Sequence, residues 1–153
     1  MDAPAYRERL GVPLRWWVQG VMLVALLFLF FIVAVPEPVA FSVTGVGLAL
    51  LVAGLVSYGS ARLEVSEAGF RAGRAHIEPG FLGTAEALDA DRTRRVAGPE
   101  ANVRAFLVLR PYLKRAVRVE ITDPADPTPY WLVSSRHPDE LAAALNGLAD
   151  AAT

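Results

Sequence analysis

The chain of 153 residues contains no cysteine and only two histidines. The lack of cysteine excludes disulfides, thiolate metal sites and cysteine nucleophiles. Two histidines fall short of the three or four ligands that a protein metal site usually needs. The sequence also has no G-x-S-x-G motif and no glycine-rich loop of the phosphate-binding type. We therefore expect no metal, no cofactor and no enzymatic activity.

An excess of basic charge is also missing. The chain has 15 Lys and Arg against 16 Asp and Glu, and its formal net charge is −1. Proteins that bind nucleic acid normally carry a clear basic excess, so we do not expect that partner. Lys114 is the one lysine, and alanine is abundant. This bias is typical of a GC-rich bacterial genome.

Charged side chains are absent from two long apolar runs, residues 16–35 and 39–58, which are separated by a turn at 36–38. About 20 apolar residues in a helix cross the hydrocarbon core of a bilayer. In hydrocarbon each backbone amide needs a partner within its own helix, so the pattern predicts a transmembrane helical hairpin over residues 16–58. No ionisable side chain lies in the middle of either run, which argues against a transporter core or a proton relay.

A cleaved signal peptide is the alternative for the first run. The apolar core of such a peptide has about 7–15 residues, and this run is longer. The best cleavage-like site, near Ala40, is followed at once by more apolar chain and has Pro38 at an unfavourable place. Two retained spans are therefore the preferred interpretation.

Arginines flank the hairpin on its outer sides, whereas the connecting turn carries only Glu37 as a charged residue. Basic residues remain on the cytoplasmic side of a membrane. The arginines are Arg7, Arg9 and Arg15 before the first run, and Arg62, Arg71 and Arg74 after the second. We therefore expect a protein of the bacterial plasma membrane with a cytoplasmic segment over residues 1–15 and both termini in the cytoplasm.

Small side chains recur at every fourth position of the second run. A stripe of this kind lets another helix approach closely. The stripe consists of Gly45, Ala49, Ala53 and Ser57, and the bulky face of the first run consists of Val24, Leu27, Phe28 and Phe31. We expect the two faces to pack within the hairpin; contact with a second copy of the chain is the alternative.

Residues 61–153 change to the period-two alternation of β-strands. Strands are predicted around 63–66, 70–72, 77–88, 105–109, 117–122 and 130–135, with a short helix or ordered loop at 89–96. Pro138 and the acidic pair Asp139 and Glu140 indicate the start of a helix over about 138–150. The expected fold class is membrane α+β: the hairpin, then a small antiparallel β-rich domain with a C-terminal helix, in the outline of a pleckstrin-homology-like (PH-like) domain.

Two features of this domain are candidate interaction sites. Arg92, Arg94 and Arg95 could together hold anionic lipid headgroups, although interspersed carboxylates make an ordinary mixed surface the alternative. Arg110 and Tyr112 flank Pro111, and both residue types are enriched at binding hot spots. A strand end packed beneath the tyrosine is the alternative there.

Three runs, YRERLGVPLRWW, RAFLVLRPY and DPADPTPYWLVSSRHPDEL, resemble a family of small two-span membrane proteins of actinobacteria that has no assigned activity. The resemblance covers nearly the whole chain and implies a membrane location. With the composition, it leads us to expect a non-catalytic interaction or scaffold module that serves envelope assembly through an unknown protein partner. A reader of anionic lipid headgroups is the alternative.

Overall fold

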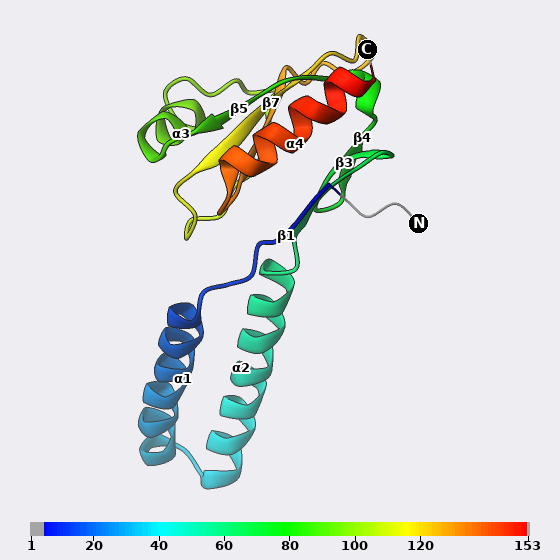
Figure 1. Cartoon of the computed structure of the whole chain (residues 1–153). Coiled ribbons are helices and arrows are strands. Elements are labelled where there is room, and N and C mark those ends of the chain that lie inside the picture. Colours follow the sequence, from blue (N-terminus) through cyan, green and yellow to red (C-terminus); the bar gives the residue numbers. More distant parts are fainter. Residues whose placement is uncertain (1–4, 153) are drawn as a thin grey trace. The chain divides into compact units, whose positions relative to one another are not determined.

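The computed structural model describes residues 5–152, which form two compact units. Residues 11–60 form the hairpin unit, and the segments before and after them together form the β unit (Figure 1). The hairpin is thus inserted into the sequence of the β unit. The N-terminal segment belongs structurally to the domain that follows the hairpin.

The hairpin unit consists of α1 (Leu14–Ala34) and α2 (Glu37–Tyr58). Each helix begins two residues before the predicted apolar run. A proline occupies the N-cap position of both helices, Pro13 with φ −66° and ψ 149° and Pro36 with φ −56° and ψ 141°. By length and composition both helices are long and apolar enough to cross a membrane.

The two helices approach each other where a glycine faces a bulky side chain. A Cβ added to Gly20 of α1 would lie 2.8 Å from a methyl carbon of Leu51 on α2. Phe28 contacts Phe41 with ring centroids 5.3 Å apart, and Ala40 is fully buried. Close approach therefore depends on the small residue of α1.

The stripe of small residues on α2 does not face α1. This corrects our expectation that the stripe packs within the hairpin. All four residues, Gly45, Ala49, Ala53 and Ser57, are exposed. The less exposed positions of α2 instead follow the spacing 40, 44, 47, 51, 55 and 58. The small and bulky roles are reversed relative to the prediction, since α1 supplies the glycine and α2 the leucine. Contact with a second copy stays a prediction.

The first sheet of the β unit has the strand order β1-β2-β3-β4 and is antiparallel throughout. No strand was expected in the segment before the hairpin, yet β1 pairs with β2 from Tyr6 opposite Val65 to Arg9 opposite Arg62. The tight turn before β3 uses Gly69, whose φ of 129° disfavours other residues. The strands are β1 (Tyr6–Arg9), β2 (Arg62–Ser66), β3 (Gly69–Ala72) and β4 (Ala75–Ile77).

The second sheet has the order β5-β7-β8-β6. It is mixed rather than antiparallel as expected, because β6 runs parallel to β8. Residues 109–115 form a loop through Pro111, so β6 does not pair with its successor β7. The strands predicted around 117–122 and 130–135 correspond to β7 and β8, which pair as an antiparallel hairpin. The strands are β5 (Leu82–Leu88), β6 (Phe106–Val108), β7 (Ala116–Ile121) and β8 (Tyr130–Ser134), and a 3-10 turn, η1 (Pro79–Phe81), precedes them.

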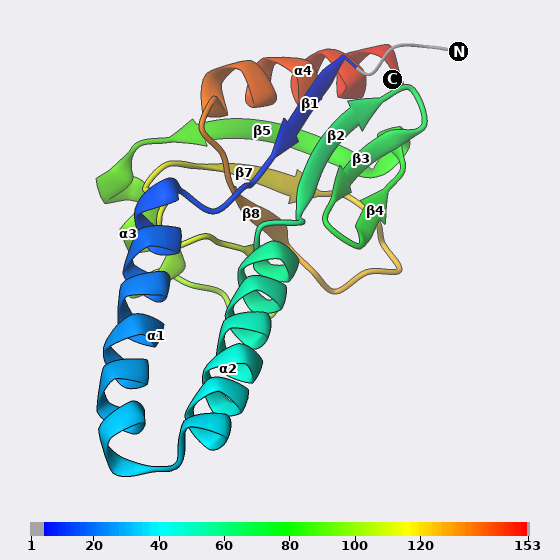
Figure 2. The same ribbon diagram turned by 90° about the horizontal axis from the view of Figure 1, so that it is seen from below.

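Two helices complete the β unit, α3 (Ala90–Ala97) and α4 (Pro138–Ala151). The side chain of Asp89 caps α3 by accepting a hydrogen bond from the backbone N–H of Arg92 at 2.7 Å. Helix α4 lies along β5 and buries Leu141 and Leu145 in the main core (Figure 2). The same core contains Leu10, the residue after β1. The predicted C-terminal helix therefore packs on the sheets through its buried leucines.

Because β1 is part of the β unit, a fragment of residues 61–152 lacks a strand and the buried Leu10. We expect a fusion in which Asn-Gly replaces residues 11–60 to be more stable than this fragment by about 2 kcal/mol or more, since burial of a leucine contributes that much. A two-residue turn fits, because Leu10 N–H donates to the Ala61 carbonyl at 2.9 Å. Urea unfolding followed by circular dichroism measures the difference; equal midpoints would contradict it.

Candidate functional site

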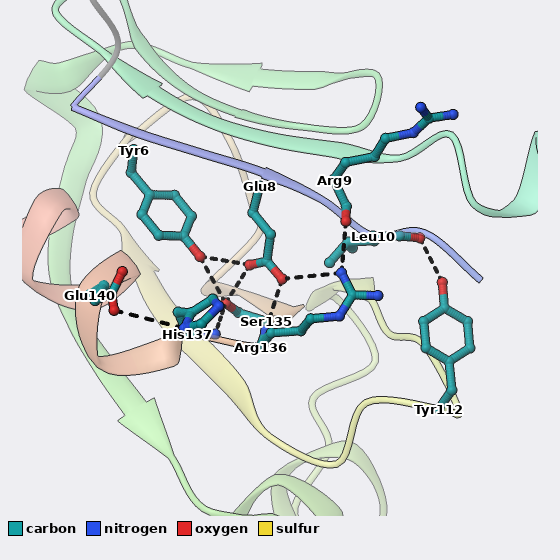
Figure 3. Close-up of polar contacts among 9 residues, drawn as sticks. All are labelled: Tyr6, Glu8, Arg9, Leu10, Tyr112, Ser135, Arg136, His137 and Glu140. Atoms are coloured by element: carbon teal, nitrogen blue, oxygen red, sulfur yellow. Dashed lines mark hydrogen bonds and ion pairs between the residues drawn. The ribbon is translucent and has the colours of Figure 1, made fainter. Parts of the chain in front are cut away.

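A buried carboxylate on β1 is the centre of the most connected polar cluster in the described residues. Glu8 is 8% exposed. Its Oε2 accepts hydrogen bonds from the Tyr6 hydroxyl and the Ser135 hydroxyl, both at 2.6 Å, and its Oε1 accepts one from the backbone N–H of Arg136 at 2.9 Å (Figure 3). We call these four residues the Glu8 cluster. A carboxylate removed from water needs such partners.

The alternation of side chains along β1 explains why this carboxylate is buried. Tyr6 and Glu8 point to the interior face, whereas Arg7 and Arg9 point outward. In register, Glu8 lies opposite the fully buried Leu63 of β2. The sequence pattern alone would place a glutamate on the solvent side, so sequence reasoning missed this residue.

Arg136 and Tyr112 hold the backbone of the same segment. The Arg136 guanidinium donates to the Arg9 carbonyl at 2.8 Å and lies 3.9 Å from Glu8 Oε1. The Tyr112 hydroxyl donates to the Leu10 carbonyl at 2.7 Å. The C-terminal part of the β unit therefore fixes the strand that precedes the hairpin through charge-assisted and neutral hydrogen bonds.

The surroundings of the Tyr6 hydroxyl favour the neutral phenol. Burial, and then the hydrogen bond to Glu8, raise the pKa of Tyr6 well above its ordinary value of 10.0. The phenol thus stays a hydrogen-bond donor at neutral pH. The Ser135 hydroxyl accepts from the His137 N–H at 3.0 Å, and the His137 ring lies 3.7 Å from Glu140. The Ser135 hydroxyl therefore bonds β1 through Glu8 and bonds the backbone N–H of His137 at the start of α4.

A polar cavity of about 560 Å³ lies beside the Glu8 cluster. Residues of β1 line one side, and Arg136, His137 and Glu140 line the other. Within residues 5–152 no group of three or more His, Cys, Asp or Glu side chains is arranged to hold a metal ion. The cavity thus presents guanidinium and carboxylate groups together.

The predicted basic residues of α3 lie together but each has a carboxylate nearby. Arg92 and Arg95 lie 3.9 and 3.8 Å from Glu100, and Arg94 lies 3.7 Å from Asp91. These contacts are exposed and therefore weak. They correspond to the mixed charged surface that was the alternative to a lipid site at this helix.

Arg110 and Tyr112 occupy the loop after β6, on either side of Pro111. The backbone N–H of Arg110 donates to the Ser134 hydroxyl at 3.0 Å. Tyr112 is bonded to Leu10 as described, so both candidates make contacts inside the β unit. This matches the packed strand end that was the alternative to a hot spot. Their role toward a partner stays untested.

The architecture is that of two long apolar helices inserted between neighbouring strands of one β unit. Comparison with protein-family models matches residues 5–145 to the family described as Protein of unknown function (DUF3093). The chain therefore belongs to this family, and the match covers the hairpin unit and most of the β unit. No curated protein and no solved structure matches the chain.

The Glu8 cluster predicts an alkaline dependence of stability. Tyr6→Phe removes a hydrogen bond to a carboxylate, so we expect it to destabilise the Asn-Gly fusion by about 1–2 kcal/mol at neutral pH. A raised folded-state pKa means that this contribution is complete below the unfolded pKa of 10.0 and is lost as pH rises through the folded value. The deficit of the variant should therefore shrink above pH 10. Urea midpoints across pH test this, and a deficit that stays constant would contradict it.

Proposed function

We propose that this protein is a non-catalytic interaction module anchored in the bacterial plasma membrane by the α1–α2 hairpin. The outward faces of the hairpin support insertion, because bulky apolar side chains such as Phe30 and Val33 are exposed along it. Exposed apolar surface on this scale is typical of contact with lipid. The resemblance to two-span actinobacterial proteins agrees with this location.

The pairing of β1 with β2 supports a common side for both ends of the chain. These strands flank the hairpin in sequence and are hydrogen-bonded to each other. If α1 and α2 span the bilayer, the segment before and the domain after them share one side of it. The flanking arginines favour the cytoplasmic side, since the turn at Glu37 has no basic residue.

The observation that carries an interaction role is the uncovered edge of the second sheet at β6. This strand ends the order β5-β7-β8-β6 and exposes apolar side chains. Leu107 is 43% exposed, Phe106 is 37% exposed and contacts Trp131, and Val103 just before the strand is 99% exposed. An apolar sheet edge is a template for an added strand. We assign it to a protein partner in envelope assembly.

The opposite edge of this sheet, at β5, is covered by a side chain of α4. The Asn146 side chain of α4 accepts a hydrogen bond from the Ala85 N–H at 2.9 Å and donates to the Ala85 carbonyl at 3.0 Å. This amide takes the place of a neighbouring strand on β5. The contrast between the two edges supports β6 as the surface for a partner.

The PH-like character of the β unit is part of the proposal. Two four-stranded sheets and a C-terminal helix that packs on their common core support it. The parallel pairing of β6 with β8 departs from the antiparallel outline. Fold likeness carries no ligand with it, so the interaction role depends on β6.

Membrane topology can be tested directly because the natural chain has no cysteine. We expect Glu37→Cys to react with a membrane-impermeant maleimide in intact cells. Glu67→Cys, on the exposed turn before β3, should react only after permeabilisation. The reverse pattern would contradict the orientation, and release of the protein by alkaline carbonate would contradict insertion.

A partner at β6 can be tested by photo-crosslinking in native membranes. A photoreactive residue at Val103 should give a discrete protein adduct, whereas one at Glu86 on the covered strand β5 should not. Leu107→Lys places a charge on the edge, so it should abolish the adduct while changing stability by no more than about 0.5 kcal/mol. An adduct that survives this change, or none at Val103, would overturn the role of β6.

A further inference from the structure

The outer face of the first sheet concentrates arginine. Register partners share a face of a sheet, and alternate residues of one strand do so too. The interior face is apolar apart from the Glu8 cluster. The outer face carries Arg7, Arg9, Arg62, Glu64, Arg71 and His76. Four arginines against one glutamate give this face a formal charge of +3, whereas the whole chain has −1.

Two of these arginines directly oppose each other. Arg9 and Arg62 are register partners at the ends of β1 and β2, and both are exposed. Like charges in this position destabilise a sheet. Arg7 lies 3.2 Å from Glu64, but no carboxylate within residues 5–152 lies within ion-pair distance of Arg9, Arg62 or Arg71. Figure 3 shows the Arg9 side chain directed away from the Glu8 cluster.

This face differs from the basic residues of α3, which were predicted from the sequence as a candidate lipid site. On α3, each of Arg92, Arg94 and Arg95 has a carboxylate within 4.0 Å. On the first sheet, Arg9, Arg62 and Arg71 have no carboxylate of the described residues within that distance. Arg9 and Arg62 also lie directly opposite each other. The fold thus retains an unfavourable arrangement of cations on the sheet, and an external anion would relieve it.

Chain connectivity limits how far Arg9 and Arg62 can lie from the adjoining ends of α1 and α2. Residues 10–13 separate Arg9 from α1, and residues 59–61 separate α2 from Arg62. An extended chain spans at most about 3.6 Å per residue, so each link is shorter than about 20 Å. Near the end of a spanning helix on the cytoplasmic side, the anions at hand are the headgroups of acidic lipids.

We propose that the outer face of the first sheet binds the phosphate groups of anionic lipids in the inner leaflet through Arg9, Arg62 and Arg71. A guanidinium presents paired donors that match two phosphate oxygens. The proposal rests on membrane insertion, as the proposed function does, and is independent of the partner at β6. An acidic protein would be a different occupant of the same face.

The test uses the full chain in nanodiscs made from equal amounts of phosphatidylglycerol and phosphatidylcholine. Native mass spectrometry of the released protein gives the ratio of the two lipids that stay bound. The variant Arg9→Gln, Arg62→Gln, Arg71→Gln is compared with a matched control, Arg92→Gln, Arg94→Gln, Arg95→Gln. Both variants remove three positive charges, so a general charge effect would change them equally.

We expect the sheet variant to lose at least about tenfold in the preference for phosphatidylglycerol, because each basic residue near an anionic surface contributes about fivefold. The control should stay within about twofold of the natural chain. Reconstitution in about 1 M salt should also abolish the preference. In pure phosphatidylcholine the sheet variant should melt no lower than the natural chain, since Arg9 and Arg62 no longer repel each other.

Equal losses in the two variants, or a preference that survives in the sheet variant, would overturn the proposal. Survival of the preference in the sheet variant would leave an acidic protein as the occupant of this face. A chain that enters the nanodiscs but shows no lipid preference would overturn only this proposal. A chain that fails to enter them would overturn membrane insertion and the proposed function with it.

Discussion

The buried carboxylate of Glu8 is the contact on which the arrangement of the β unit depends. It joins a strand that precedes the hairpin to the segment between β8 and α4, more than 120 positions later in the chain, through Ser135 and Arg136. A carboxylate in this environment is tolerated only when its partners are present. These bonds hold β1 against the segment between β8 and α4, so the strand before the hairpin belongs to the same unit as the strands after it.

Two surfaces of the β unit differ in chemical character, and each matches one of the proposed contacts. With β1 in place, the first sheet gains a second row of arginines, because Arg9 is set opposite Arg62. In the second sheet, the side chain of Asn146 on α4 bonds the edge strand β5, whereas the other edge strand, β6, has no strand beside it on its outer side. A charged face suits a headgroup layer, and an apolar edge suits a protein strand. The two proposed contacts can thus form at the same time.

Several local features were predictable because each depends on residues close in sequence. The hairpin follows from two uncharged runs, and the start of α4 follows from Pro138. The hairpin β2–β3 follows from alternation around Gly69. The candidate residues were less predictable. No local sequence pattern indicates that the Tyr112 hydroxyl donates a hydrogen bond to the Leu10 carbonyl. The arginines of α3 were candidates only because they are close together in the sequence.

The amino-acid sequence by itself determined the apolar hairpin, the family, most strand positions and the C-terminal helix, because periodicity and capping act within a few residues. Tertiary structure alone decided that Glu8 is buried, that Gly20 rather than the stripe at Gly45 faces the other helix, and that β6 runs parallel to β8. It also set Arg9 opposite Arg62. The physical reason is that strand pairing and burial depend on residues tens of positions away in the chain. A local sequence pattern does not specify which distant segment will become the partner.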